Sequence, residues 1–454
     1  MAAGLALARP NLLNPNNPIR SLSLAFWLWK AFVFLIIIGC PGPGYDTSTG
    51  LLPYQESAAS GAKLEAIRHA PFSFPLKLVR WDSIYFVHIV RDDYVFEQEW
   101  AFGYGYTRIL SFLTSGKVLP QFSGLDGVAR VALIAVALSH IAHYFSVLAL
   151  YRLSINIFGH DNTSGALISF LSAALHIICP AGAFLSAPYG ESLFSFLNIT
   201  GYFLYSSSLL DANAGKRASS DAKLLLAAAL FSIATAVRSN GILSGALFAF
   251  DALLQLRKIF TQGISGDILL RLGVIVVGGC VIALGLIVPQ WIAYTTFCMS
   301  DEPLRPWCEQ LIPSIYGWVQ VHYWNVGFLR YWTLSNLPLF ILAFPMLFLM
   351  CRSSIWALNT AWPSDTATAV LTRLAAPNGL LAVMAFTSYH VQIINRISSG
   401  YPLWYWYIIC QLSSHVADSS SVVKRSQTFS IAIQGMVIYA IVQAVLFGSF
   451  LPPA

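Results

Sequence analysis

Charged residues are scarce in this chain of 454 residues: only 10% are Asp, Glu, Lys or Arg, whereas 57% are hydrophobic. A soluble domain has about 25% charged residues, so this chain could not cover a water-facing surface in the usual way. Dense basic clusters are also lacking, which argues against nucleic-acid binding, and the high hydrophobicity excludes disorder. The class that remains is a membrane protein, and long continuous apolar runs favour helices over a β-barrel.

Metal-binding cysteine patterns are lacking too. The seven cysteines form no CxxC pair and no Cys/His cluster with zinc spacing, so a metal site would have to use carboxylates. Cys298 and Cys308 fall in one loop that we place on the oxidising side of the membrane. Their position favours a disulfide, with free buried thiols as the alternative.

The apolar runs predict about eleven transmembrane helices. Their ranges are 22–39, 128–150, 164–179, 191–210, 224–237, 242–256, 269–297, 337–351, 378–394, 402–415 and 429–450. Lys and Arg in the connections fall largely on one side, which the positive-inside rule identifies as cytosolic. The sequence therefore predicts one all-α polytopic membrane domain over residues 1–454, with a cytosolic N-terminus. Several runs are short, so merged or half helices would change the count by one or two.

Two long polar segments lie on the opposite, lumenal side, at about 40–127 and about 298–336. The first holds nine of the chain's twenty acidic residues. Loops of this length are uncommon and are often functional. Apolar residues at Phe86, Ile89, Val90 and Tyr94 have the spacing of a helix lying in the membrane interface.

Asp82, in the sequence Arg80-Trp81-Asp82, is the sharpest candidate for chemistry in this first loop. At the first turn of an interfacial helix its carboxylate could accept a hydrogen bond from a free backbone N–H, and the helix dipole would favour its negative charge. The alternative is a catalytic base. The spacing by itself leaves both roles open.

Other charged residues stand at lumenal breaks between apolar runs. Arg238 and Arg396 each interrupt such runs, and a guanidinium there needs an anion, either a phosphate or a carboxylate such as Glu191. Glu97 and Glu99 stand among aromatic residues, as in a sugar-binding edge or a membrane-surface loop. The aromatic run 404–406 suits an aromatic belt or a sugar platform.

Five motifs, taken together and in order, resemble one known family. They are RWDSIYF at 80–86, EQ at 97–98 with AF at 101–102, SAPYGES at 186–192, RSNG at 238–241, and Arg396 with Ser398, Ser399 and Pro402. The set resembles the PIG-V family, to which GPI mannosyltransferase 2 belongs. One departure is Ala101-Phe102-Gly103-Tyr104, where the family usually has Ala-Phe-Phe-Pro.

The resemblance implies a GT-C glycosyltransferase of the endoplasmic reticulum membrane with a lumenal active site. It implies transfer of the second mannose of the GPI precursor, in α-1,6 linkage, from dolichol-phosphate-mannose to a mannosyl-glucosaminyl-phosphatidylinositol. It also implies a small accessory membrane subunit. No nucleic-acid partner is expected.

Roles for single residues follow as hypotheses. Asp82 is the expected general base of an inverting displacement, and Arg238 or Arg396 would neutralise the departing phosphate. Residues expected to bind or orient the substrates are Arg80, Trp81, Glu97, Gln98, Tyr189, Glu191, Arg238, Asn240, Arg396, Ser398 and Ser399. No cofactor or metal is expected, because arginine can balance a phosphate leaving group, although carboxylates could hold a metal.

Two rival functions share these features. Another GT-C transferase could use a dolichol-phosphate sugar with a different acceptor. A transporter or lipid scramblase would share the helix count and the intramembrane charges. Transporters usually place such groups near the midplane on broken helices, whereas here most lie at helix ends on one face.

Overall fold

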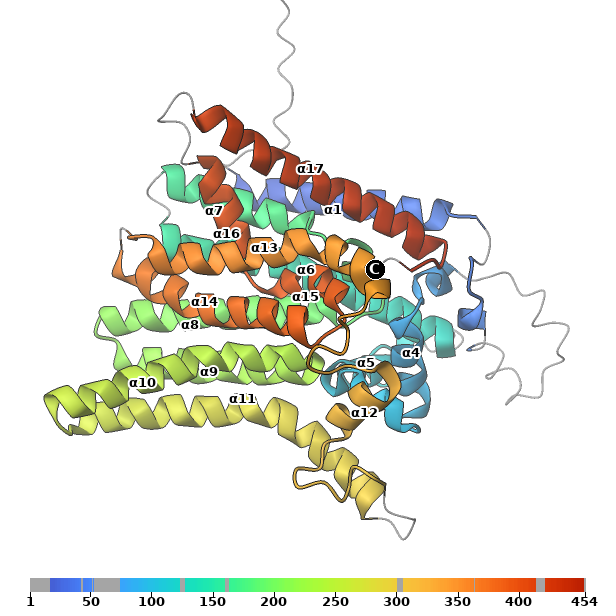
Figure 1. Ribbon diagram of the computed structural model, residues 1–454, viewed down its shortest axis with the longest axis horizontal. Coiled ribbons are helices and arrows are strands. Elements are labelled where there is room, and N and C mark those ends of the chain that lie inside the picture. The colour runs from blue at the N-terminus through green and yellow to red at the C-terminus, as the bar shows by residue number, and fades with distance from the viewer. Residues whose placement is uncertain are drawn as a thin grey trace, which may run out of the picture.

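The computed structural model describes residues 17–41, 44–50, 52, 74–122, 127–159, 163–299, 305–362, 364–413 and 421–452. Its described residues form helices and no strand. The long helices lie side by side as a bundle, and several short helices gather at one end of it (Figure 1). The chain is an all-α protein, as the apolar runs predict.

A helix is present at each of the eleven predicted positions. These helices are α1 (Pro18–Gly39), α6 (Gly127–Phe158), α7 (Thr163–Ile177), α8 (Glu191–Asn213), α9 (Arg217–Val237), α10 (Gly245–Gln262), α11 (Gly266–Cys298), α13 (Leu337–Asn359), α14 (Asp365–Thr387), α16 (Leu403–Ser413) and α17 (Ser421–Gly448). Seven helices among the described residues are long and apolar enough to cross a membrane. Of the others, α7 and α16 are short, and α10 carries Asp251, Arg257 and Lys258.

The largest boundary error concerns α14, which the sequence predicts over 378–394. The helix begins at Asp365, where the Ser364 side chain accepts a hydrogen bond from Ala367 N at 3.0 Å. Pro377 lies inside the helix and does not end it. Proline is tolerated in membrane helices because neighbouring groups satisfy the freed backbone.

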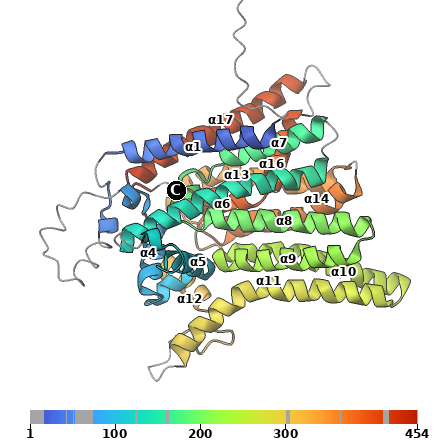
Figure 2. The same cartoon turned by 180° about the vertical axis from the view of Figure 1, so that it is seen from behind.

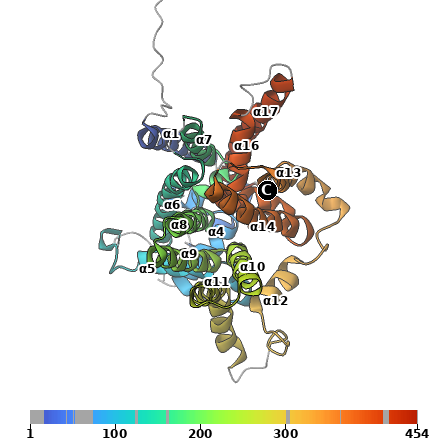
Figure 3. The same ribbon diagram turned by 90° about the vertical axis from the view of Figure 1, so that its left-hand side faces the viewer.

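The bundle has two rows of helices when it is viewed end-on (Figure 3). In one row α6, α8, α9 and α11 follow one another as packed neighbours; in the other, α16, α13, α14 and α10 do. Glycine permits the closest approach in the first row, since a Cβ at Gly285 of α11 would lie 2.1 Å from the Ser232 carbonyl oxygen of α9. Small residues commonly bring membrane helices together in this way.

The edge of the bundle is formed by α1 and α17, which lie side by side although they come from opposite ends of the chain (Figure 2). The two helices are also joined just beyond their ends. Tyr45 N, after α1, donates to Ser449 O, after α17, at 2.9 Å. Phe450, just beyond α17, is fully buried there.

The short helices come from the two predicted loops. The first loop supplies α4 (Asp82–Asp92), the 3-10 helix η3 (Glu97–Ala101) and α5 (Tyr104–Thr114), so the helix expected around Phe86 is confirmed. The second loop supplies α12 (Ile315–Trp324). A disulfide between Cys298, at the end of α11, and Cys308 closes the first part of this loop. Part of the first loop, residues 53–73, lies outside the described residues.

Candidate active site

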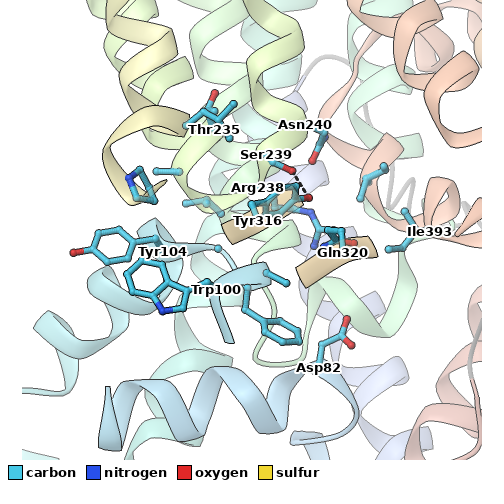
Figure 4. A pocket seen from close by; sticks show the side chains of 18 of the residues that line it. Asp82, Trp100, Tyr104, Thr235, Arg238, Ser239, Asn240, Tyr316, Gln320 and Ile393 are labelled. Carbon is cyan, nitrogen blue, oxygen red and sulfur yellow. Dashed lines mark hydrogen bonds between the residues drawn. The ribbon is translucent and has the colours of Figure 1, made fainter. Parts of the chain in front are cut away.

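A cavity of about 280 Å³ opens at the end of the bundle where the short helices gather. Its walls come from α4, η3 and α5 of the first loop, from the end of α9, from α11 and α12, and from the segment around α15 (Ile394–Ile397). Figure 4 shows Asp82 on one side of this space and Arg238, Ser239 and Asn240 on the other. The cavity therefore draws on segments spread over most of the chain.

Asp82 is the first residue of α4, and its carboxylate lines the cavity. Trp81 is the N-cap residue, and the Asp82 carboxylate accepts no hydrogen bond from a backbone N–H of the described residues. Instead, Ser83 Oγ accepts from Arg80 N at 2.5 Å and donates to Arg80 O at 2.6 Å, which closes the turn that precedes the helix. The capping role for Asp82 is therefore wrong, and its carboxylate is available for other contacts.

Those contacts are made to Arg396, a residue 314 positions away. Arg396 Nη2 donates to Asp82 Oδ2 at 3.2 Å, and 41% of the Asp82 side chain stays exposed. The backbone just before it is strained, because Trp81 has a φ of 53°, which costs of order 1–3 kcal/mol for a bulky residue. Strain of this kind is often found where a functional side chain must be held in place.

Glu191 lies behind the cavity wall as a fully buried carboxylate. Its Oε1 accepts from Arg238 Nη1 at 2.8 Å and lies 3.3 Å from Arg396 Nε. The negative charge of Glu191 is favoured by its place in the fold, because Glu191 begins α8 and the N-terminus of a helix carries partial positive charge. The predicted ion pair between Arg238 and Glu191 is thus present, and the phosphate role of Arg238 stays a prediction.

The four side chains form one alternating cluster: Asp82, Arg396, Glu191 and Arg238. Burial works to lower the pKa of Arg396, but Glu191 and then Asp82 raise it above its ordinary value. The Arg396 guanidinium also lies 4.4 Å from the centre of the Phe184 ring. Arg396 is therefore held as a permanent cation between two carboxylates.

Of the other residues predicted to bind substrate, Asn240 lines the cavity and is held by Tyr401, whose hydroxyl donates to Asn240 O at 2.8 Å. Arg80 and Trp81 lie outside the lining. Arg80 is buried with its guanidinium 4.5 Å from the Phe450 ring centre, and Trp81 packs edge-on against the same ring. Tyr189 donates to Arg80 O at 2.7 Å. These three brace the strained turn before Asp82.

Glu97, Gln98, Ser398 and Ser399 also lie outside the lining. Glu97 accepts from Trp307 Nε1 at 3.1 Å and so ties η3 to the second loop. Ser398 and Ser399 are buried, and their carbonyl oxygens accept from the side chains that follow them, as in the contact of Trp404 Nε1 with Ser398 O at 3.1 Å.

The aromatic run 404–406 is fully buried, so both the belt and the sugar-platform interpretations are wrong. Trp406 Nε1 donates to Ser154 Oγ at 2.7 Å inside the bundle. A ring can be buried with its polar atom when such a partner is within reach. The partner is on α6, about 250 positions earlier, which local sequence cannot reveal.

The departure at Gly103 has a structural explanation in this chain. A Cβ at Gly103 would lie 1.8 Å from the Val237 carbonyl oxygen, so only glycine fits where the first loop meets the end of α9. This contact brings Phe102 and Arg238 to the same cavity.

Several lining residues were not singled out from the sequence. The clearest set lies on α12, where Tyr316, Gln320 and Trp324 all face the cavity. Their i, i+4, i+8 spacing was the available signal, because such residues share one face of a helix. No group of three or more His, Cys, Asp or Glu side chains close enough for a metal occurs within the ranges that the structure describes.

Fold and site together define a multi-pass helical membrane protein with a charged cavity at one end of its bundle. A family profile described as "Mannosyltransferase (PIG-V)" matches residues 32–454. The chain therefore belongs to the PIG-V family of mannosyltransferases, and the resemblance seen in its motifs is confirmed. It is a membrane-embedded mannosyltransferase of GPI-anchor biosynthesis.

Curated relatives carry the name "GPI mannosyltransferase 2". The protein from Aspergillus oryzae is 95% identical over 454 residues and is covered in full, as is this chain. The one from Aspergillus fumigatus is 55% identical over 98% of this chain and 95% of its own length. That from Saccharomyces cerevisiae is 28% identical over 96% and 100%.

Among solved structures, an oligosaccharyltransferase from Archaeoglobus fulgidus covers 77% of this chain and 47% of its own. The identity is 13% and the TM-score 0.40, a likeness too weak to support an inference.

Proposed function

We propose that this enzyme transfers the second mannose of the GPI precursor in α-1,6 linkage, with dolichol-phosphate-mannose as donor. The acceptor is a mannosyl-glucosaminyl-phosphatidylinositol, the fold is GT-C, and the cavity faces the lumen of the endoplasmic reticulum. The observation that supports this most is the Asp82 carboxylate, which lies exposed at the cavity beside Arg396 and does not cap the helix.

The chemistry is a single in-line displacement, since a β-linked donor gives an α-linked product. The acceptor oxygen attacks the anomeric carbon while the bond from that carbon to the phosphate oxygen breaks. The electron pair leaves with dolichyl phosphate, and Asp82 takes the proton of the acceptor hydroxyl. Every atom and charge is accounted for without an added cofactor.

Arg238 is the better candidate for the departing phosphate. Arg396 is already engaged by both Asp82 and Glu191. Arg238 has one carboxylate partner, because only its Nη1 donates to Glu191; its buried Nε, like that of Arg396, has no hydrogen-bond partner among the described residues. An arginine with unused donors at a cavity wall suits a phosphate, whose charge grows in the transition state.

The decisive experiment is mannose transfer by an Asp82→Asn variant in microsomes that contain the full chain and no imposed gradient. We expect a loss of about 10²–10⁴-fold in kcat, the usual contribution of a general base. Asp92→Asn, at the exposed end of the same helix, is the matched control and should keep transfer within about two-fold. Near-normal turnover by Asp82→Asn would contradict the base assignment.

A second experiment tests Arg238. Arg238→Lys keeps the charge but loses the fork, so the KM for the donor should rise. Unaltered donor use would reduce Arg238 to a structural partner of Glu191.

Co-purification from fungal membranes tests the accessory subunit that the family resemblance implies.

A further inference from the structure

α12 lies outside the two rows of long helices (Figure 1). Its side chains make two different kinds of contact. Ile315 and Val319 are buried and pack in one cluster with Trp100 and Trp307. On the other face, Tyr316, Gln320 and Trp324 line the cavity. A short helix with one face anchored and one face open to a cavity is built to present side chains to a ligand.

Trp324, at the end of this face, continues a row of rings from the first loop. Tyr85 and Phe102 stack with ring centres 4.5 Å apart and planes 15° from parallel. The Trp324 ring meets Phe102 edge-on at 5.9 Å. Its backbone is held by the segment before α15, because His390 Nε2 lies 3.0 Å from Trp324 O.

This row begins beside the proposed base. Tyr85 follows Asp82 by three residues on α4, so the two side chains share a face of the helix. Tyr85 is 37% exposed and lines the cavity, so part of its side chain is accessible to a ligand there. The other end of α12 leads away from Asp82, because Tyr316 shares a 2.8 Å hydrogen bond with Ser239, next to Arg238 (Figure 4).

The cavity thus has a phosphate side at Arg238 and an aromatic side at Asp82. In an inverting displacement the attacking hydroxyl and the leaving phosphate lie on opposite sides of the anomeric carbon. The base must contact the attacking hydroxyl, so the acceptor lies on the side of Asp82. Sugars present apolar C–H faces, and aromatic rings in binding sites bind such faces by stacking.

We propose that Tyr85, Phe102 and Trp324 form the subsite on which the terminal hexose of the acceptor stacks. This inference rests on the proposed function and adds to it the location of the acceptor. It makes these three rings determinants of acceptor affinity, while donor affinity depends on Arg238.

The test is steady-state transfer in microsomes, with the mannosyl-glucosaminyl-phosphatidylinositol acceptor and the dolichol-phosphate-mannose donor titrated separately. Trp324→Ala and Tyr85→Ala should each raise the KM for the acceptor about three- to ten-fold, the range expected for one aromatic contact. The KM for the donor should change by less than about two-fold. Trp324→Phe, which keeps a ring, should restore most of the acceptor affinity.

The matched control is Trp318→Ala. Trp318 is on the same helix but stacks on His322 and does not line the cavity, so neither KM should change. An equal rise in both KM values, or a rise for the donor alone, would overturn the acceptor assignment. An acceptor KM equal to that of the unmodified enzyme in both alanine variants would also overturn the assignment. Transfer by the unmodified enzyme to this acceptor decides the proposed function separately, because its absence would refute that function whatever the variants do.

Discussion

Among the described residues, two clusters pair a buried carboxylate with arginine, and they differ in how many of their polar atoms lack a hydrogen-bond partner. At the cavity, Glu191 Oε2 and Arg238 Nε have no hydrogen-bond partner among the described residues. In the other cluster, Asp251 uses both oxygens: Oδ1 accepts from Arg373 Nε at 2.7 Å and Oδ2 from Tyr205 hydroxyl at 2.6 Å. We call these the open cluster (Asp82, Arg396, Glu191, Arg238) and the closed cluster (Asp251, Arg373, Tyr205).

Helix α8 contributes to both clusters, Glu191 at its first turn and Tyr205 fourteen residues later, about 21 Å along the axis. Arg373 completes the closed cluster by donating to Ala369 O at 2.8 Å and covering the Phe250 ring. A buried ion pair costs desolvation, so a saturated one serves the fold, whereas unused donors beside a cavity remain for a ligand. Burial and charge alone do not separate the two; the remaining hydrogen-bonding capacity does.

The largest expected effect comes from removing charge in the open cluster. Glu191→Gln keeps the shape but leaves Arg238 without its carboxylate partner and Arg396 with Asp82 alone, so both guanidinium groups are held less firmly. We expect kcat/KM for mannose transfer to fall about 100-fold or more, as when one preorganised electrostatic group is removed. Asp251→Asn is the control and should keep kcat per folded molecule. Equal losses in both variants would erase the distinction between the clusters.

The closed cluster should respond in stability instead. Asp251→Asn leaves the Arg373 charge buried without its anion, which costs about 3–5 kcal/mol of unfolding free energy. Denaturant unfolding of the detergent-purified protein measures this change. A loss below about 1 kcal/mol would show that the pair contributes little to the fold.

A double replacement sharpens the comparison. Asp251→Leu with Arg373→Met removes both charges, so stability should return to within about 1–2 kcal/mol of the unmodified protein. Glu191→Leu with Arg238→Met should recover no transfer activity, because a ligand cannot be held by packing alone. Unfolding curves and transfer rates of the two double variants provide the measurement. Restored activity in the second would make the open cluster structural.

The disulfide should have a smaller effect, confined to the α12 side of the cavity. Cys298 and Cys308 close a short loop, which contributes roughly 3 kcal/mol by chain entropy. Cys298→Ser should therefore raise the acceptor KM a few-fold and leave donor KM unchanged. Cys280→Ser, an exposed free thiol on α11, is the control.

The smallest effect concerns pH and lies outside both clusters. The hydrogen bond that His88 Nδ1 donates to Glu99 Oε1, at 2.6 Å, raises the pKa of His88 above its ordinary value, against the effect of burial, and Asp92 adds to the rise. This stabilisation is fully present below about pH 6.5 and is lost as pH rises through the raised pKa. Thermal unfolding should show less than about 1 kcal/mol lost from pH 6 to pH 8. His88→Gln should abolish that dependence, and an unchanged dependence would assign it to another group.

The sequence by itself determined the class of protein, the eleven helical segments and the family. Scarce charge and long apolar runs are properties of composition, and helix periodicity depends on near neighbours, so both can be read without a structure. Asp82, Arg238 and Arg396 also stood out, since a charge among apolar runs is conspicuous wherever its partner lies.

Only the tertiary structure decided what those residues do to one another. Asp82 was a candidate for a helix cap as well as for a base; in the structure Ser83 closes the turn and Arg396, 314 positions away, contacts the carboxylate. Arg80 and Trp81 belong to the same motif as Asp82 yet brace it from behind through Phe450 at the far end of the chain. The face of α12 entered the site in the same way. Such pairings are made by packing between distant segments, and no local pattern encodes them.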